Sequence, residues 1–207
     1  MKRFLTGFIL LFLFTTNNYA QTDDYTKWIV RARGIYVSPS TGDNLDDAKV
    51  NISSTFVPEL DFTYFINKNL AVELILATTK HNVDVKADGD KIDLGHVWLL
   101  PPTLSLQYHF YTGKFKPYLG AGVNYTFFYG IDEGNVVEGM DYDNAFGFSI
   151  QAGADYDLNE KWFINVDLKR LFLSTDVEVD TGEGFLPVEV DIDPFIFGVG
   201  VGYRLNW

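Results

Sequence analysis

The chain of 207 residues carries 28 acidic and 16 basic side chains, a formal net charge of −12 that argues against nucleic-acid binding. It contains no cysteine, which excludes disulfides and thiol chemistry, and its aromatic content of 16% is too high for a disordered acidic chain.

The first twenty residues have the pattern of a secretory signal peptide. Lys2 and Arg3 form a basic start, residues 4–14 an apolar stretch, and residues 15–20 a polar region that ends in Ala20. The apolar stretch is well short of the roughly twenty residues that a membrane-spanning helix needs. We therefore expect residues 1–20 to be a signal peptide and residues 21–207 to form one domain, because no low-complexity linker divides them.

Beyond the signal, apolar side chains recur at every second position in eight segments, the pattern of strands with one apolar face. In chain order the segments are 27–37, 56–66, 70–78, 102–110, 118–128, 146–156, 162–169 and 195–207. Most are about ten residues long, which at a tilt near 45° is enough to cross a hydrocarbon layer of about 25 Å. The segment lengths therefore indicate membrane-spanning strands whose apolar face meets lipid.

The second face of these segments carries charged and amide side chains, which a packed protein core cannot accept unpaired but a polar barrel lumen can. The residues that we expect to line the lumen are Arg31, Arg33, Glu59, Asp61, Glu73, Ile75, Gln107, Asn124, Gln151, Asp167, Lys169 and Arg204. Two interpretations of the charged members remain open. They could conduct ions, or they could form salt-bridged networks that close the lumen.

The connections alternate in length. Residues 67–69, 112–116 and 159–160 are short, whereas the other connections are long and rich in Asp and Glu. Outer-membrane barrels have short periplasmic turns and long extracellular loops. The sequence thus predicts an all-β fold, an eight-stranded antiparallel transmembrane β-barrel with four long extracellular loops and both termini in the periplasm. Its location would be the outer membrane of a Gram-negative bacterium, with the membrane lipid as its surroundings.

Two central runs carry a family resemblance: Leu100-Pro101-Pro102-Thr103-Leu104 with Gln107-Tyr108-His109-Phe110, and residues 116–126, KPYLGAGVNYT. They resemble the OmpW family, and the resemblance extends over nearly all of residues 21–207. It implies a barrel with a narrow, largely apolar lumen that serves small hydrophobic solutes and suggests their lateral release into the bilayer. In that family, apolar side chains from the third and seventh strands pinch the lumen. The matching positions are Ile75 and Lys169, and Lys169 departs from the large aromatic expected there.

The last segment ends in Trp207, with Gly202 and Leu205 before it. This ending resembles the sorting signal that the barrel-assembly machinery recognises, so that machinery is an expected partner during biogenesis.

Three prolines are candidates for a lateral exit: Pro58, Pro101 and Pro102. Proline cannot donate to a strand ladder, so pairing near these positions should be weak and could open a route into lipid. The alternative is that they are ordinary strand-start or bulge prolines without a role in transport.

The inward positions of the later segments are rich in glycine, namely Gly120, Gly122, Gly147, Gly153, Gly198, Gly200 and Gly202. These glycines could leave a void along one wall, or they could permit the sharp curvature of a small barrel.

The sequence gives no sign of an enzyme. His81, His96 and His109 lack a serine-containing motif beside them, and the acidic loops lack the spacing of a calcium site. We expect no catalytic residues, no cofactor and no metal. The main hypothesis is a narrow channel for small, mainly hydrophobic molecules. The alternative is a non-conducting barrel with a structural, adhesion or stress-tolerance role through its acidic loops.

Overall fold

The computed structural model describes residues 25–40, 48–87, 90–133, 139–180 and 185–205. The expected signal peptide and Trp207 lie outside these residues. Among them no helix is both long and apolar enough to cross a membrane.

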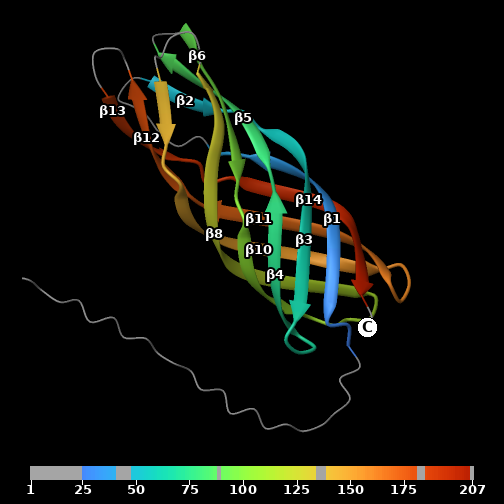
Figure 1. Ribbon diagram of the computed structural model, residues 1–207. Helices are drawn as coiled ribbons and strands as arrows, with labels where there is room; N and C mark the ends of the chain where they lie inside the picture. Colours follow the sequence, from blue (N-terminus) through green and yellow to red (C-terminus); the bar gives the residue numbers. More distant parts are fainter. Residues whose placement is uncertain (1–24, 41–47, 88–89, 134–138, 181–184, 206–207) are drawn as a thin grey trace, which may run out of the picture.

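Eight antiparallel strands close into a barrel (Figure 1). They are β1 (Trp28–Ser38), β3 (Thr55–Phe65), β4 (Leu70–Ala77), β7 (Thr103–His109), β8 (Phe115–Glu133), β10 (Ala145–Asp157), β11 (Trp162–Phe172) and β14 (Phe195–Leu205). Each strand pairs with the next, and β14 pairs with β1 to close the ring. The eight predicted segments correspond one to one to these strands, so the predicted eight-stranded barrel is confirmed.

The register sets the tilt of the strands. A row of paired residues that starts at Trp28 runs around the whole barrel and returns to β1 at Ser38, ten residues further along the strand. For eight strands this offset corresponds to a tilt of about 40°. A strand of 11 residues, such as β1, then rises about 27 Å, which matches the apolar band of outer-membrane barrels.

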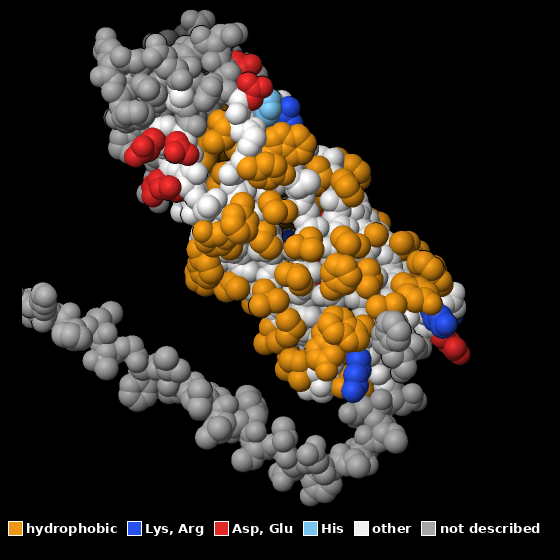
Figure 2. Space-filling model, viewed as in Figure 1, with side chains coloured by type: hydrophobic (Ala, Val, Ile, Leu, Met, Phe, Trp, Pro, Cys, Tyr) orange, Lys and Arg blue, Asp and Glu red, His pale blue; other side chains and the backbone are white. Residues whose placement is uncertain are grey.

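Side chains alternate strictly between the two faces of the wall. In β7, every second residue from Thr103 to His109 is buried and the residues between them are exposed. The exposed positions of the barrel are mostly large and apolar, among them Leu104, Leu106 and Tyr108. Figure 2 shows this apolar belt covering the visible side of the barrel, with Asp and Glu gathered beyond it at one end. The apolar side of the strands therefore faces outward.

The two ends of the barrel differ. The end that we call the turn end carries the short connections and both described ends of the chain (Figure 1). The opposite end, the loop end, carries further strands: β2 (Ala48–Ile52), β5 (Thr79–Ala87), β6 (Asp90–Leu100), β9 (Gly139–Tyr142), β12 (Ser174–Asp180) and β13 (Phe185–Asp191). Strands β2, β5 and β6 extend the barrel wall through the pairing of β6 with β8, whereas β9, β12 and β13 form a separate three-stranded sheet.

The long connections thus lie at one end as predicted, but they contain strands that the sequence analysis did not predict. A small apolar cluster supports these strands from inside, with Val83, Val97, Leu99, Leu173 and Ile192 among its buried members.

Candidate functional site

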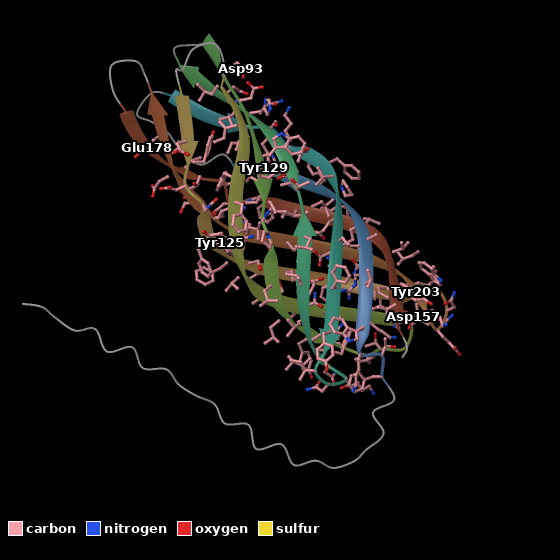
Figure 3. All side chains as sticks on the ribbon, viewed as in Figure 1. Asp93, Tyr125, Tyr129, Asp157, Glu178 and Tyr203 are labelled. Atoms are coloured by element: carbon pink, nitrogen blue, oxygen red, sulfur yellow. The ribbon has the colours of Figure 1, made fainter. Side chains whose placement is uncertain are left out.

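The twelve predicted lumen residues all lie in the barrel interior, each with 7% or less of its surface exposed. They do not form one continuous channel lining. Most belong to a network of charges that fills the middle of the barrel, three of them border an apolar chamber on the loop side, and Arg204 lies in a separate space at the turn end. In Figure 3, Asp93 and Glu178 mark the loop end, and Asp157 and Tyr203 mark the turn end.

Arg31 on β1 is the first centre of the charged network. Its Nη1 atom lies 3.0 Å from Asp61 Oδ1 on β3, and its Nη2 atom 3.1 Å from Asp155 Oδ2 on β10. The guanidinium also donates to Thr63 Oγ1 at 2.7 Å. Because these partners come from β3 and β10, the side chain of Arg31 bridges the barrel interior.

Arg33, two residues further along β1, is the second centre. Its Nη2 atom lies 2.7 Å from Asp61 Oδ2 and 3.1 Å from Glu73 Oε1, and its Nε atom lies 2.7 Å from Glu59 Oε1. Successive inward positions on one strand thus place two guanidinium groups on top of one another. Their shared carboxylates hold them together, as buried charges require.

Neutral side chains complete the network. Gln107 and Gln151 donate to Glu73 Oε2 at 2.7 and 2.8 Å. The hydroxyl of Tyr118 donates to Asp167 Oδ2 at 2.7 Å, and Asn165 donates to that hydroxyl at 3.1 Å. The alternation of the seventh segment places Asn165 on the same face as Asp167. Tyr118 was not predicted, although its alternation with Gly120 could have identified it as inward-facing.

The charged network occupies the middle of the lumen. Strand β14 supplies space, because its inward positions 198, 200 and 202 are glycines. A Cβ at Gly202 would lie 2.0 Å from Phe163 Cζ, and one at Gly200 would lie 2.1 Å from Ala32 O and 2.7 Å from Arg33 Cγ. These two glycines therefore border occupied space and leave no void. Of the two interpretations of the inward charges, the salt-bridged network is the arrangement that the structure contains.

The chamber lies on the loop side of the network. Its floor is the ion pair of Lys169 and Glu59, with Nζ 2.9 Å from Oε1. Its walls are mainly apolar and include Ile35, Val37, Ile75, Ala77, Pro101, Leu99, Leu171, Leu173, Ile192 and Ile196, with Thr79, His81, Thr103 and Thr126 as polar members. The volume of the chamber is about 40 Å³. It is thus a narrow apolar space above a charged floor.

The barrel wall beside the chamber has a gap in its backbone pairing. The ladder between β3 and β4 ends at Glu59 and Ala77. Toward the loop end, the next backbone hydrogen bond on this side runs from Ser53 N to Asn82 O. On the opposite edge of β4, the ladder with β7 ends at the pair Ile75 and Thr103. Pairing starts again between β5 and β6 at the pair Thr79 and Leu99. Backbone pairing is therefore interrupted on both sides of Thr78.

Pro58 explains the interruption toward β3. The amide of Ile66 donates to Leu70 O, so the even-numbered residues of β3 direct their backbone groups toward β4. Pro58 is therefore a residue that should donate to this neighbour, and it has no N–H.

Pro101 has the same effect from the other side. In β7 the amide of His109 donates to Asn69 O beside β4, so the odd positions face that strand, Pro101 among them. Pro102 faces β8, where its carbonyl accepts from Tyr125 N at 3.2 Å. Of the three predicted prolines, Pro58 and Pro101 thus border the gap, and Pro102 does not.

A vestibule of about 370 Å³ opens at the turn end. Arg204 lies here, where its guanidinium pairs with Asp157, which also binds Lys116 Nζ at 2.6 Å. The sequence analysis grouped Arg204 with the other lumen residues, but its position at the end of β14 places it apart from the central network.

His81 and His96 lie at adjacent rungs of the ladder between β5 and β6, and His109 lies separately on β7. His109 packs between Phe65 and Tyr118 inside the barrel, and His96 lies near Asp132 in the loop-end wall. His81 borders the chamber from β5, where its Nδ1 donates to Ser53 O at 2.6 Å, and burial lowers its pKa. Within the described ranges, no group of three or more His, Asp or Glu side chains is placed to hold a metal ion.

Comparison with known proteins agrees with this architecture. The OmpW family model matches residues 25–205. An outer-membrane protein of Sinorhizobium fredii, y4mB, is 43% identical over 185 residues, 86% of this chain and 80% of the relative. The dibenzothiophene metabolism operon protein PahQ of Pseudomonas aeruginosa is 33% identical over 160 residues, 75% of this chain and 72% of the relative.

Among solved structures, the outer membrane protein OprG of Pseudomonas aeruginosa superimposes with a TM-score of 0.81 at 28% identity, covering 88% of this chain and 97% of OprG. The family match spans nearly all the described residues and the fold is shared. The chain therefore belongs to the OmpW family and is an outer-membrane β-barrel.

Proposed function

We propose that this barrel takes small, mainly apolar molecules into the chamber at its loop end and releases them sideways into the bilayer. The observation that carries the proposal is the position of the apolar chamber, which lies above a closed ionic network and beside the gap in the wall. In this account the turn end and both termini are periplasmic, and the loop end faces the exterior.

A straight passage through the lumen is disfavoured by the charged network. An apolar molecule would have to displace Arg31, Arg33 and their carboxylates, which are all almost fully buried. Breaking buried ion pairs costs several kcal/mol for each unpaired charge. A route that leaves the barrel above the network avoids this cost.

The gap offers such a route. Ala77, Thr79 and Pro101 line the chamber and also border the missing pairing. Strands can separate there without breaking backbone hydrogen bonds, because Pro58 and Pro101 supply no donors. The name of PahQ refers to the metabolism of an apolar aromatic compound, which agrees with an apolar solute.

The chamber must widen to accept a solute, because its 40 Å³ is room for only a few waters. Many of its lining residues have flexible aliphatic side chains. Changes in their rotamers would enlarge the chamber without a movement of the backbone.

A matched pair of tryptophan variants tests the proposal. Ile75 is 4% exposed and lines the chamber, whereas the next residue, Leu76, is 38% exposed on the outer face of the same strand. We expect Ile75→Trp to fill the chamber and to abolish the uptake of a neutral N-phenylnaphthylamine dye by cells that produce the barrel. Leu76→Trp should leave uptake unchanged. Equal uptake by both variants would exclude the chamber as the route.

A second candidate function is a non-conducting barrel that acts through its acidic loop end. The observation that favours it is the acidic outer sheet, in which Glu178 lies directly opposite Asp141. If the wild-type barrel adds nothing to dye uptake or to conductance, this alternative replaces the first. In either case the barrel-assembly machinery would recognise the last strand, through Gly202, Leu205 and the terminal Trp207.

A further inference from the structure

We infer that the chamber discriminates by charge: it admits neutral and cationic apolar molecules and rejects anionic ones. This inference rests on the proposed function and specifies the class of solute. It comes from the balance of charges below the chamber and from the hydrogen-bonding state of the polar groups that line it.

The central network carries more carboxylates than cations. Arg31, Arg33 and Lys169 face Glu59, Asp61, Glu73, Asp155 and Asp167, and each of the eight has 4% or less of its surface exposed. Three positive and five negative groups leave two excess negative charges at neutral pH. In a buried site, solvent screens this excess poorly, so an ion in the chamber above it is exposed to its field.

Lys169 is the cation that would attract an anionic solute, but two carboxylates already lie against it. The ammonium lies 2.9 and 3.0 Å from the two oxygens of Glu59 and 3.1 Å from Asp167 Oδ1. The ammonium donates hydrogen bonds to Glu59, and the carboxylate of Asp167 lies beside it as an ion pair. A carboxylate entering the chamber would therefore meet a cation whose charge two carboxylates already offset.

The other polar groups of the chamber repeat this arrangement. Thr103 donates its hydroxyl proton to Pro101 O at 3.1 Å, and Thr126 donates to Asn124 Oδ1 at 2.8 Å. His81 uses Nδ1–H on Ser53 O, which leaves Nε2 of the neutral ring as an acceptor. The donors of these three side chains are thus committed, whereas carboxylate, hydroxyl and imidazole lone pairs can still accept. The chamber therefore offers more acceptors than donors, which favours an ammonium or hydroxyl group on a solute over a carboxylate.

The separate outer sheet at the loop end has the same sign. The sequence contains no Lys or Arg between residues 117 and 160 or between 171 and 203, the two stretches that supply this sheet, whereas β2, β5 and β6 carry four lysines. The acidic side chains Asp141, Asp176 and Glu178 of the outer sheet are exposed. An anion would therefore be repelled on the side of the outer sheet as well as at the floor.

Three naphthalene derivatives of nearly equal size test the inference: naphthylmethylamine as the cation, naphthylmethanol as the neutral probe and naphthylacetate as the anion. Binding is measured by equilibrium dialysis against barrels in phosphatidylcholine nanodiscs, with empty nanodiscs subtracted. Phosphatidylcholine carries no net charge, so the lipid does not favour either ion. For the wild type we expect the anion to bind at least about tenfold more weakly than the neutral probe, and the cation at least as tightly as the neutral probe.

Charge variants locate the origin of the effect. Glu59→Gln removes one negative charge from the floor and frees a donor of Lys169, so the difference between neutral and anionic probes should shrink. Asp157→Asn is the matched control: it removes a carboxylate in the turn-end vestibule, on the far side of the network, and should leave the difference unchanged. Retention of the heat-dependent electrophoretic shift of folded barrels verifies folding of both variants.

The outcomes separate the two proposals. If naphthylmethanol binds but anion and cation bind equally, or if Asp157→Asn acts like Glu59→Gln, the inference on charge is wrong and the proposed function stands. If none of the three probes binds above empty nanodiscs, the chamber is not a solute site and both proposals fall.

Discussion

Arg31 and Asp155 join two strands across the barrel interior, with Nη2 of the arginine 3.1 Å from Oδ2 of the aspartate. Strands β1 and β10 are not neighbours in the sheet, because β14 and β11 lie between them. The contact is therefore an ion pair that crosses the lumen. It lies within the charged network in the middle of the barrel.

Removal of the Arg31–Asp155 ion pair should lower the stability of the barrel. Arg31→Met leaves Asp155 buried without its counter-charge and removes one of the two arginines that pair with Asp61, and we expect a loss of about 3 kcal/mol or more in the free energy of unfolding. Urea titration of the barrel in lipid bilayers measures it. The control is Arg170→Met, because Arg170 lies on the outer face with a partly exposed ion pair to Asp193, for which we expect a loss of about 1 kcal/mol or less. Equal losses for both arginines would contradict the assigned role.

Gly202 should tolerate no side chain while Phe163 is present. A Cβ at Gly202 would lie 2.0 Å from Phe163 Cζ, whereas the nearest atom to a Cβ at Gly198 is Ile35 Cγ2 at 3.1 Å. We expect Gly202→Ala to destabilise the barrel by about 1–3 kcal/mol through overpacking, and Gly198→Ala to cost clearly less. Addition of Phe163→Leu should recover part of the loss in the Gly202 variant. No recovery in the double variant would show that the aromatic ring is not the cause.

Acidification should loosen the loop-end wall at His81. Burial lowers the pKa of His81, so the unfolded chain binds the proton more readily than the folded one. The stabilisation is present above the unfolded value of about 6.5 and is lost as the pH falls from there through the lowered pKa of the folded state. We expect lower protection of the Ser53 and Asn82 amides, measured relative to the intrinsic exchange rate at each pH, at pH values below about 6, and a smaller change with pH in His81→Gln. Protection factors that do not change with pH in the wild type would contradict this role.

The outer sheet should gain stability from a charge reversal. Glu178 on β12 lies directly opposite Asp141 on β9, and both side chains are exposed. Like charges at opposed positions destabilise a ladder, so Glu178→Lys should stabilise it by about 0.2–1 kcal/mol. Slower hydrogen exchange of the β9 and β12 amides would register this gain, and Glu178→Gln should give a smaller one. Faster exchange in the lysine variant would show that this pair does not limit the sheet.

The strands and their faces could be predicted because a two-residue period is a local property of the sequence. All eight barrel strands were located from it within a few residues, except β8, which extends to Glu133 and is longer than predicted. The strands at the loop end could not be predicted, because they are short or separated by short breaks. Thr78 alone separates β4 from β5, and Pro101 with Pro102 separates β6 from β7.

The candidate site was predictable only as a set of inward residues. Which charges meet depends on the closure of the barrel: Lys169 and Glu59 are 110 residues apart in the sequence, and Arg31 and Asp155 are 124 apart. The alternation assigns Arg204 to the inner face but not to a level along the barrel axis, which is why its place in the vestibule was missed. Likewise, the prolines indicated weak pairing, but the extent of the gap follows from the three-dimensional register.

The most direct test of the account closes the gap with a covalent link. The chain has no native cysteine, so Val57→Cys with Thr79→Cys can form a disulfide across the missing pairing between β3 and β5. Dye uptake is compared for the oxidised and reduced forms of this barrel. The control is Ile164→Cys with Val201→Cys, a pair of opposed residues on the intact ladder between β11 and β14. If solutes leave through the wall at this place, oxidation of the first cysteine pair blocks dye uptake and reduction restores it. Dye uptake by the control barrel stays the same in both forms. Uptake that is the same in the oxidised and the reduced form of the first pair would contradict lateral release.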